Sequence, residues 1–409
     1  MPVSPKIYIL LFPLFFLLFY VESIKIGGVM VSQLWKMPLA LYMLYYVFQY
    51  RHRPTPVWTQ TQYWQSLKWI FTGGYVSQFM FNIQTSVKFL FLPLLFSYIR
   101  NKEWNIEQLR AILLTIVQYF VLTNIPFLFF GFKGMSHGHD YGSYVAYSGL
   151  FQNQHAMSVI MAICVVVMLF FLKKRYVEGR WHRLYNMLLI CLAAYAMYLG
   201  FARTGWLMCL LAVVVVFWPK NLMVRQWMGL AAVGLVIVIG LSYMLATNDL
   251  FYDRVVGNNI TTHEHMNVTS GRTEYTVAAL ERYADGNPIE WLIGVSTENI
   301  YEAIFVNTGN RVGAHNGFVD TLARNGVIGL GLMLVFLISL LLFIRRRKEC
   351  SSYRMALAMW VMIFSFQVTQ GGVMFHTDLL YALIFCLLEK EDELLTEKQT
   401  QYATDKRLS

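Results

Sequence analysis

A histidine and asparagine pair, His315 and Asn316, precedes a long apolar segment that contains several glycines and ends in four consecutive cations. Imidazole titrates near neutral pH, so a histidine at the edge of such a segment can act as a general base or donate a hydrogen bond to a reacting group. The alternative is a structural role as a hydrogen-bond donor. The residue types alone leave these roles open.

Arg272 is a second candidate, in the stretch TSGRTEYTVAALERYADGNP. This stretch predicts a helix, because small and aromatic residues recur at helical spacing and Thr269 or Ser270 can cap its start. A cation in the first turn of a helix is disfavoured by the helix dipole, and a bound anion would offset that cost. Free backbone N–H groups and a guanidinium together suit a phosphate. The alternative is an ion pair with one of the many carboxylates nearby in the sequence.

Two further charged residues lie in or beside apolar segments. Arg203 occupies the turn GFARTGWL between two such segments. A charge at the edge of the hydrocarbon is costly unless it has a function or its side chain extends to the interface. Asp378, in MFHTDLLY, lies within an apolar segment, where it predicts a functional role or a pairing with a cation on a neighbouring helix.

The composition indicates which scaffold must position these residues. The chain has 409 residues, of which 57% are hydrophobic and only 14% are charged. So much apolar surface cannot be buried in one soluble core, and we predict an all-α integral membrane protein with about twelve transmembrane helices. The predicted spans are residues 7–24, 37–50, 69–83, 86–99, 108–130, 153–172, 184–201, 203–218, 227–246, 326–344, 355–370 and 373–388.

The distribution of Lys and Arg predicts the orientation, because cytoplasmic loops collect these residues. With both termini inside, the inner loops and the termini hold most of the 33 basic residues, and Lys68 is counted in the inner loop before the third span. This asymmetry explains the net charge of +10 without nucleic acid as a partner. We therefore expect a multi-pass membrane protein with both termini in the cytoplasm.

One long hydrophilic loop stands out in this topology. We predict nine spans within residues 1–246, a periplasmic loop over 247–325, three spans within 326–388 and a cytoplasmic tail over 389–409. The acidic residues of the loop outnumber its arginines, and it has no lysine, so the arginines are not a general basic coat. Loops of this length are usually functional. The predicted topology places Arg203, Arg272 and His315 on the same outer face.

Two histidine pairs offer a weaker alternative, an outer metal site. They are His137 and His139 with Asp140, and His263 and His265 with Glu264. Neither set has an established ligand spacing, so we expect solvated loop residues and no metal or other cofactor.

The His315 region also contains a longer pattern. Nine residues separate Asn316 from Gly326, and two more lead to Gly329, which gives H-N-x9-G-x-x-G. This pattern resembles the signature of the O-antigen ligase and polymerase superfamily, in which His is followed by Asn, Ser or Gln, nine residues, Gly, two residues, and Gly, Thr or Tyr. GFARTGWL resembles the family's arginine-containing turn, and TSGRTEY its loop helix with an essential arginine. The resemblance covers residues 145 to 345.

The resemblance implies a membrane glycosyltransferase of the C-type (GT-C-like) architecture, which uses a glycan carried by undecaprenyl diphosphate at the outer leaflet of the inner membrane. It also implies that Arg203 and Arg272 bind the diphosphate, that His315 acts near the acceptor or the phosphate, and that Asn316, Gly326 and Gly329 support the site. Arginines suit a diphosphate because they bind phosphate bidentately and stay charged. We expect inversion at the transferred sugar and no need for a metal.

The acceptor stays open at this point. A ligase transfers the finished glycan to lipid A core, whereas an O-antigen or capsule polymerase joins repeat units on undecaprenyl diphosphate. We favour a ligase, because the motif reproduces the ligase signature without a departure. A rival class is a transporter of lipid-linked oligosaccharides, which should place buried charges near mid-membrane and often has repeated halves. Here the halves differ and the candidate residues gather on one face.

Overall fold

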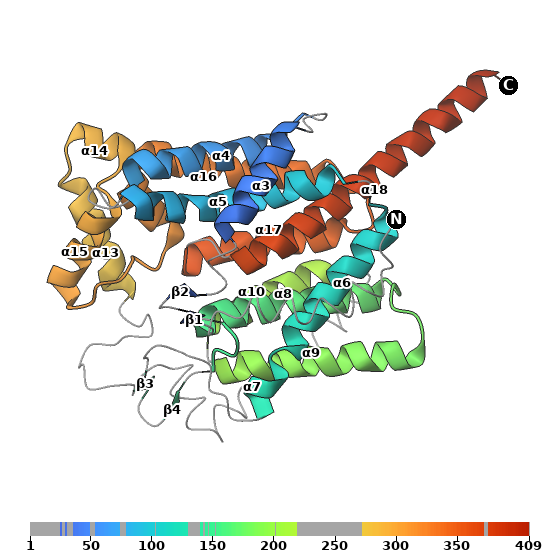
Figure 1. Ribbon diagram of the computed structural model, residues 1–409, viewed down its shortest axis with the longest axis horizontal. Helices are drawn as coiled ribbons and strands as arrows, with labels where there is room; N and C mark the ends of the chain where they lie inside the picture. Colours follow the sequence, from blue (N-terminus) through green and yellow to red (C-terminus); the bar gives the residue numbers. More distant parts are fainter. Residues whose placement is uncertain are drawn as a thin grey trace, which may run out of the picture.

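The computed structural model describes residues 25–26, 29–30, 36–49, 54–73, 79–102, 104–129, 140–141, 144–145, 147–151, 153–200, 202–218, 272–371 and 375–408. This part of the chain is almost entirely helical (Figure 1). Its helices are α3 (Lys36–Gln49), α4 (Val57–Lys68), the π-helical turn η1 (Trp69–Gly73), α5 (Phe79–Arg100), α6 (Ile106–Leu122), α7 (Ile125–Phe129), α8 (Gln154–Lys173), α9 (Arg180–Gly200), α10 (Arg203–Phe217), α13 (Arg272–Ala284), α14 (Pro288–Ile293), α15 (Thr297–Thr308), α16 (Gly317–Arg345), α17 (Tyr353–Thr369) and α18 (Phe375–Leu408). Two short hairpins complete it, β1 (Lys25–Ile26) with β2 (Val29–Met30) and β3 (Asp140–Tyr141) with β4 (Tyr144–Val145).

Several helices are long and apolar enough to cross a membrane. Among the described residues four meet both criteria, Ile106–Phe129, Gln154–Lys173, Arg180–Gly200 and Gly317–Arg345. The prediction of an all-helical chain with several apolar spans is therefore confirmed. The spans predicted at 7–24 and 227–246 lie outside the described residues.

The long helices run side by side along one axis of the molecule, and α13, α14 and α15 gather at one end (Figure 1). Helix α8 is buried along most of its length and packs against α6, α9, α10 and α17. The same hydrophobic core includes Trp58 of α4, whose ring lies edge-on to the rings of Phe96 and Phe385, with centroid distances of 4.8 Å and 5.9 Å. These aromatic contacts join α4, α5 and α18.

The predicted span at 69–83 has the wrong limits. The helix here begins at Val57, continues through η1 to Gly73, and is followed by α5 from Phe79. Hydropathy overlooked α4 because the helix is rich in glutamine and threonine, and most of these residues point into the protein. Lys68 lies at the far end of α4, where its Nζ donates to the Ile293 carbonyl at 2.8 Å. The prediction that placed Lys68 and residue 293 on opposite sides of the membrane is therefore wrong.

Helix α16 is broken near its start. Gly326 has φ 65° and ψ −171°, which interrupts the helix between a first segment from Gly317 and a long apolar segment that ends at Arg345. A Cβ atom at Gly326 would overlap the backbone of Leu292, so the close approach of α14 requires glycine here.

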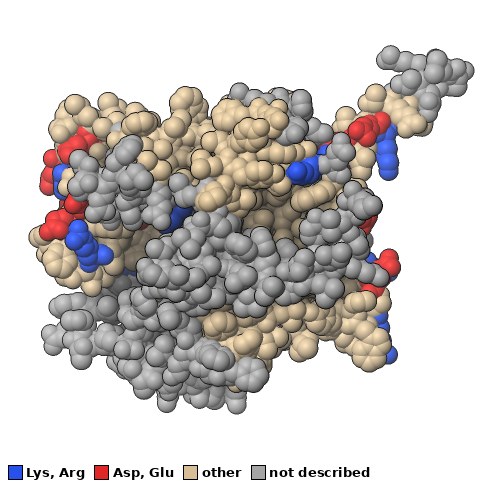
Figure 2. Space-filling view, in the orientation of Figure 1, with Lys and Arg blue, Asp and Glu red and all other residues tan. Residues whose placement is uncertain are grey.

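The two ends of the helix bundle differ in character. We call the end that carries α13, α14, α15 and His315 the cavity end, and the opposite end the ion-pair end. At the ion-pair end Arg100 pairs with Glu389 at 2.8 Å, and Arg110 pairs with Glu391 at 2.8 Å. On the face in Figure 2, the charged side chains of the described residues lie mainly toward these two ends.

Candidate functional site

His315 lies in the short segment between α15 and α16, with a left-handed backbone of φ 53°. Such a conformation costs about 1–3 kcal/mol in a residue other than glycine and is kept only where the surroundings enforce it. The next residue, Asn316, caps α16, because its Oδ1 accepts from the backbone N–H of Phe318 at 3.0 Å and of Val319 at 3.2 Å. Asn316 thus fixes the start of the helix directly beside His315.

An ion pair on α16 holds the segment that precedes His315. Asp320 Oδ1 accepts from the Ala314 backbone N–H at 3.0 Å and pairs with Arg324 at 2.9 Å. The Arg324 guanidinium in turn lies 4.7 Å from the centre of the Tyr301 ring on α15. The sequence analysis did not single out Asp320 or Arg324. Their signal is an acid and an arginine four residues apart on one helix face, inside the nine-residue gap of the motif.

A small hydrophobic core lies beneath His315. Tyr275 and Ala279 of α13 pack there with Ile300 and Ile304 of α15, and these residues are buried. The Tyr275 and His315 rings are 5.9 Å apart. Burial raises the pKa of Tyr275 above its ordinary value, so the phenol keeps its proton at neutral pH. The helix predicted around Arg272 therefore forms part of the platform that carries the histidine.

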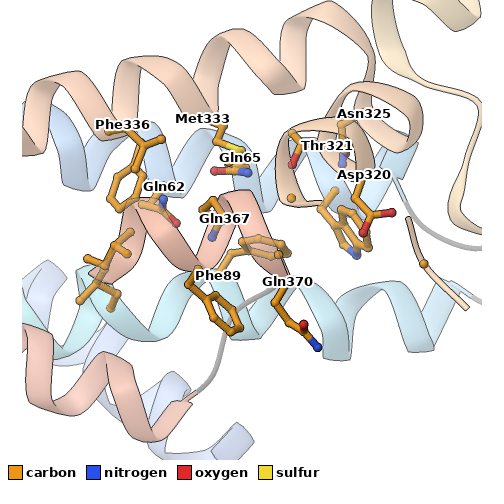
Figure 3. Close-up of a pocket in the computed structure, with 18 of the residues that line it drawn as sticks. Gln62, Gln65, Phe89, Asp320, Thr321, Asn325, Met333, Phe336, Gln367 and Gln370 are labelled. Carbon is orange, nitrogen blue, oxygen red and sulfur yellow. The ribbon is translucent and has the colours of Figure 1, made fainter. Parts of the chain in front are cut away.

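A cavity of about 340 Å³ opens beside His315 between α4, α5, α16, α17 and α18. We call a group of lining residues between α15 and α16 and in the first turns of α16 the rim of the cavity, namely Gly313, His315, Gly317, Asp320 and Arg324. The other polar lining residues are Gln62, Gln65, Thr321, Asn325, Gln367 and Gln370 (Figure 3), together with Thr377 and Asp378 of α18. The rest of the lining is largely apolar and aromatic, which is typical of small-molecule sites with a few orienting polar groups.

Arg272 is the first residue of α13 and reaches the end of α17. Its Nη1 donates to the Thr369 carbonyl at 3.0 Å. Thr369 is the last residue of α17, and the two residues that follow it, Gln370 and Gly371, line the cavity. The guanidinium therefore lies beside the rim, where the negative end of the α17 dipole favours a cation.

Arg203 does not line the cavity, and its side chain is exposed. Its helix nevertheless begins next to the cavity wall. The Ala202 carbonyl accepts from Ser158 Oγ at 3.4 Å, and the neighbouring Val159 is a lining residue. The structure therefore brings the start of α10 to the cavity end, with the Arg203 side chain on the exterior of the bundle.

The two motif glycines make room for different neighbours. A Cβ at Gly326 would overlap the backbone of Leu292 on α14, and a Cβ at Gly329 would overlap the Asn325 side chain of the same helix, while Lys68 of α4 lies at an ordinary contact distance of 3.7 Å. Lys68 completes this contact through its hydrogen bond to Ile293. Both glycines thus act through packing behind the His315 segment.

Asp378 lies at the wall of the cavity and is only 4% exposed. The hypothesis that it pairs with a cation of a neighbouring helix is wrong for the part of the chain that the structure describes, where no cation pairs with it. Its Oδ2 atom is buried and has no hydrogen-bond partner among those residues. The carboxyl group therefore faces the cavity without a protein partner for this oxygen.

Most of the residues proposed as alternative metal ligands lie outside the part of the chain that the structure describes. His137, His139, His263, Glu264 and His265 lie outside the described residues, and Asp140 is described only as backbone of β3. Within the described ranges, no group of three or more His, Cys, Asp or Glu side chains could hold a metal ion.

Comparison with known proteins yields one family. Residues 187–334 match the family model described as O-antigen ligase. The matched segment contains the candidate arginines Arg203 and Arg272 and the motif residues His315, Asn316, Gly326 and Gly329. No curated protein matches the chain. The family match, together with the complete H-N-x9-G-x-x-G motif within it, supports the similarity of this region to the O-antigen ligase and polymerase superfamily.

Proposed function

We propose that the chain is a glycosyltransferase of the O-antigen ligase type, which transfers a glycan from undecaprenyl diphosphate to lipid A core at the periplasmic face of the inner membrane. The observation that carries this proposal is the position of His315 on the rim of a polar cavity, with Arg272 beside the same rim. A titratable ring and a guanidinium at one opening suit a reaction in which a hydroxyl loses a proton and a diphosphate departs.

The proposed reaction is a single displacement with inversion. An acceptor hydroxyl oxygen forms a bond to the anomeric carbon of the donor sugar, and the bond from that carbon to the diphosphate oxygen breaks with its electron pair on the diphosphate. Arg272 and Arg203 neutralise the departing charge through bidentate hydrogen bonds. His315 accepts the hydroxyl proton as a base; if it instead donates a hydrogen bond to the phosphate, the hydroxyl proton passes to an oxygen of the departing diphosphate.

We propose the same topology as the charge distribution predicts, in a GT-C-like architecture of about twelve spans. The domains are residues 1–246, a periplasmic loop over 247–325, spans within 326–388 and a cytoplasmic tail over 389–409. Helices α13, α14 and α15 and the cavity end then face the periplasm, and both termini face the cytoplasm. Lys68 moves to the periplasmic end in this arrangement, because it bonds to Ile293. The inner loops and termini still hold most of the basic residues.

A deletion strain separates a ligase from a polymerase. Loss of a ligase should leave bare lipid A core, while polymer accumulates on undecaprenyl diphosphate. Loss of a polymerase should leave core capped with a single repeat, because ligation continues without chain growth. A gel of the lipopolysaccharide and a blot of the lipid-linked glycans distinguish these results. Core that carries one repeat would overturn the ligase proposal, and an unchanged ladder would indicate another polysaccharide, such as a capsule.

The same strain tests the role of Arg272. A plasmid copy with Arg272→Ala should fail to restore the glycan at normal protein abundance, and Arg272→Lys should restore it poorly, because lysine lacks the planar fork. Arg311→Ala is the matched control, since Arg311 is an exposed arginine of the same loop. Full restoration by Arg272→Ala would remove Arg272 from the site.

A further inference from the structure

Four glutamines line the cavity from two facing walls. Gln62 and Gln65 come from α4, and Gln367 and Gln370 come from the end of α17 (Figure 3). Polar side chains within a helix bundle are costly unless they find hydrogen-bond partners. The Gln370 Oε1 and Asp378 Oδ2 atoms are buried and have no partner among the described residues. The cavity is therefore suited to a polar ligand that supplies these missing hydrogen bonds.

The lining excludes several classes of ligand. A polyprenyl tail would leave the buried Gln370 Oε1 and Asp378 Oδ2 atoms without partners, so an apolar chain does not fit. A phosphate group does not fit either, because the lining arginine, Arg324, is already paired with Asp320. Amides both donate and accept hydrogen bonds, and so do sugar hydroxyls. The volume of about 340 Å³ lies within the range of small-molecule sites.

The depth of the cavity indicates which sugar it can hold. Met333 and Phe336 of α16 line its inner part, and at 1.5 Å per residue Phe336 lies roughly 15 Å along the helix from Gly326. Gln65 lies beside Met333 and Gln62 beside Phe336 (Figure 3), so amide side chains extend to the inner part of the cavity. A cavity of about 340 Å³ suits the terminal sugar of a glycan, because the middle of a long chain would have to continue beyond it on both sides. The reacting sugar of the donor has the diphosphate on one side and the remaining glycan on the other, whereas the reacting sugar of the acceptor is a terminal residue.

We propose that the terminal, non-reducing sugar of the acceptor binds in this amide-lined cavity. Gln62, Gln65, Gln367 and Asp378 hold hydroxyls on the inner side of the ring, and the reacting hydroxyl stays at the rim beside His315. This inference rests on the proposed transferase function and adds a binding site to it. It assigns the acceptor to the interior of the bundle and leaves the diphosphate outside the cavity, with Arg272 beside the rim and Arg203 on the exterior of the bundle.

Kinetics with the full-length protein test the assignment. The substrates are lipid A core and lipid-linked glycan, both extracted from the deletion strain. Gln62→Leu and Gln367→Leu should each raise the KM for lipid A core about tenfold, the loss expected for one or two neutral hydrogen bonds, and leave the KM for the donor unchanged. Gln60→Leu is the matched control, because Gln60 is an exposed residue of α4 outside the lining. A rise in the donor KM alone, or no difference from the control, would overturn the proposal.

A binding measurement separates this inference from the transferase proposal. Fluorescent lipid A core should bind to a His315→Ala protein, and soluble core oligosaccharide, released from its lipid by mild acid, should compete. Gln62→Leu and Gln367→Leu in this background should weaken binding about tenfold, while Gln60→Leu should not. Such a result supports the cavity even if no transfer is measured, in which case only the proposed reaction fails. Competition by the lipid portion alone, or equal binding by all variants, would contradict a saccharide site.

Discussion

The two ends of the helix bundle differ in the partners that they provide for a buried carboxyl group. At the ion-pair end, Glu391 is surrounded by donors, with Arg110 at 2.8 Å, Ser351 Oγ at 2.6 Å and the Ser352 backbone N–H at 2.8 Å. At the cavity end, the buried Asp378 has one oxygen without any partner in the described part of the chain. Both carboxyl groups belong to α18, so the difference does not come from the helix itself but from the residues that surround its first turn and its middle.

The difference indicates that the carboxylate of the ion-pair end contributes to stability and that the carboxyl group of the cavity end contributes to ligand binding. A buried carboxylate with several donors joins helices, here the first turns of α6, the segment before α17 and the middle of α18. A buried carboxylate that faces a cavity does not join helices and costs folding free energy, which is expected where a ligand later supplies the contact. Substitutions at the two ends should therefore change different observables.

The largest effect is expected at His315. His315→Ala should lower the rate of glycan transfer by about 10²–10⁴-fold, the usual contribution of a positioned acid or base, with little change in thermal unfolding. Transfer by purified protein and its melting temperature are the two measurements. Loss of folded protein in parallel with activity would mean that the histidine acts through structure, as its left-handed backbone also permits.

The reverse pattern is expected at Glu391. Glu391→Ala leaves Arg110 buried without its main partner, which should cost about 3–5 kcal/mol of unfolding free energy, while the folded fraction keeps its transfer rate. Glu107→Ala is the control, because Glu107 binds the same arginine at 2.7 Å but is 80% exposed. It should cost less than about 1 kcal/mol. Equal destabilisation by both variants would show that burial does not distinguish these pairs.

A smaller effect should separate two glycines of α16. Gly326→Ala forces a left-handed alanine against the Leu292 backbone, which should cost about 1–3 kcal/mol and displace α14 from the His315 segment. Gly331→Ala adds a methyl group where no atom lies within 4 Å, so about 0.5–1 kcal/mol of stabilisation is expected. Unfolding and transfer of both variants are the measurements, and a neutral Gly326→Ala would contradict the packing role of this motif position.

The smallest effect is expected from the removal of metal ions. Transfer by purified protein should persist in EDTA, because two guanidiniums can neutralise the departing diphosphate. Loss of activity that magnesium or manganese restores would contradict this expectation and direct attention to Asp140 and the histidine pairs.

Hydropathy and residue spacing were sufficient to predict several helices and the motif residues of the candidate site from the sequence. Apolar runs such as 153–172 and 355–370 correspond closely to α8 and α17, because a lipid-exposed or buried helix must be apolar along its whole length. The helix that begins at Arg272 was predicted from periodicity and a stop sequence, which are local signals. The motif identified His315 and both glycines, since its fixed spacing lies within one continuous segment.

Only the tertiary structure decided how the polar residues are used. Helix α4 was missed because a hydropathy sum cannot tell that its glutamines face inward, and Lys68 was misplaced for the same reason. The cavity combines Gln62 with Gln367 and Asp378, which are about three hundred residues away in the chain. Neither periodicity nor spacing encodes a contact between such distant segments. The partner of a buried polar group is set by the packing of whole helices, and this packing left Asp378 facing the cavity while Glu391 joined three segments of the chain.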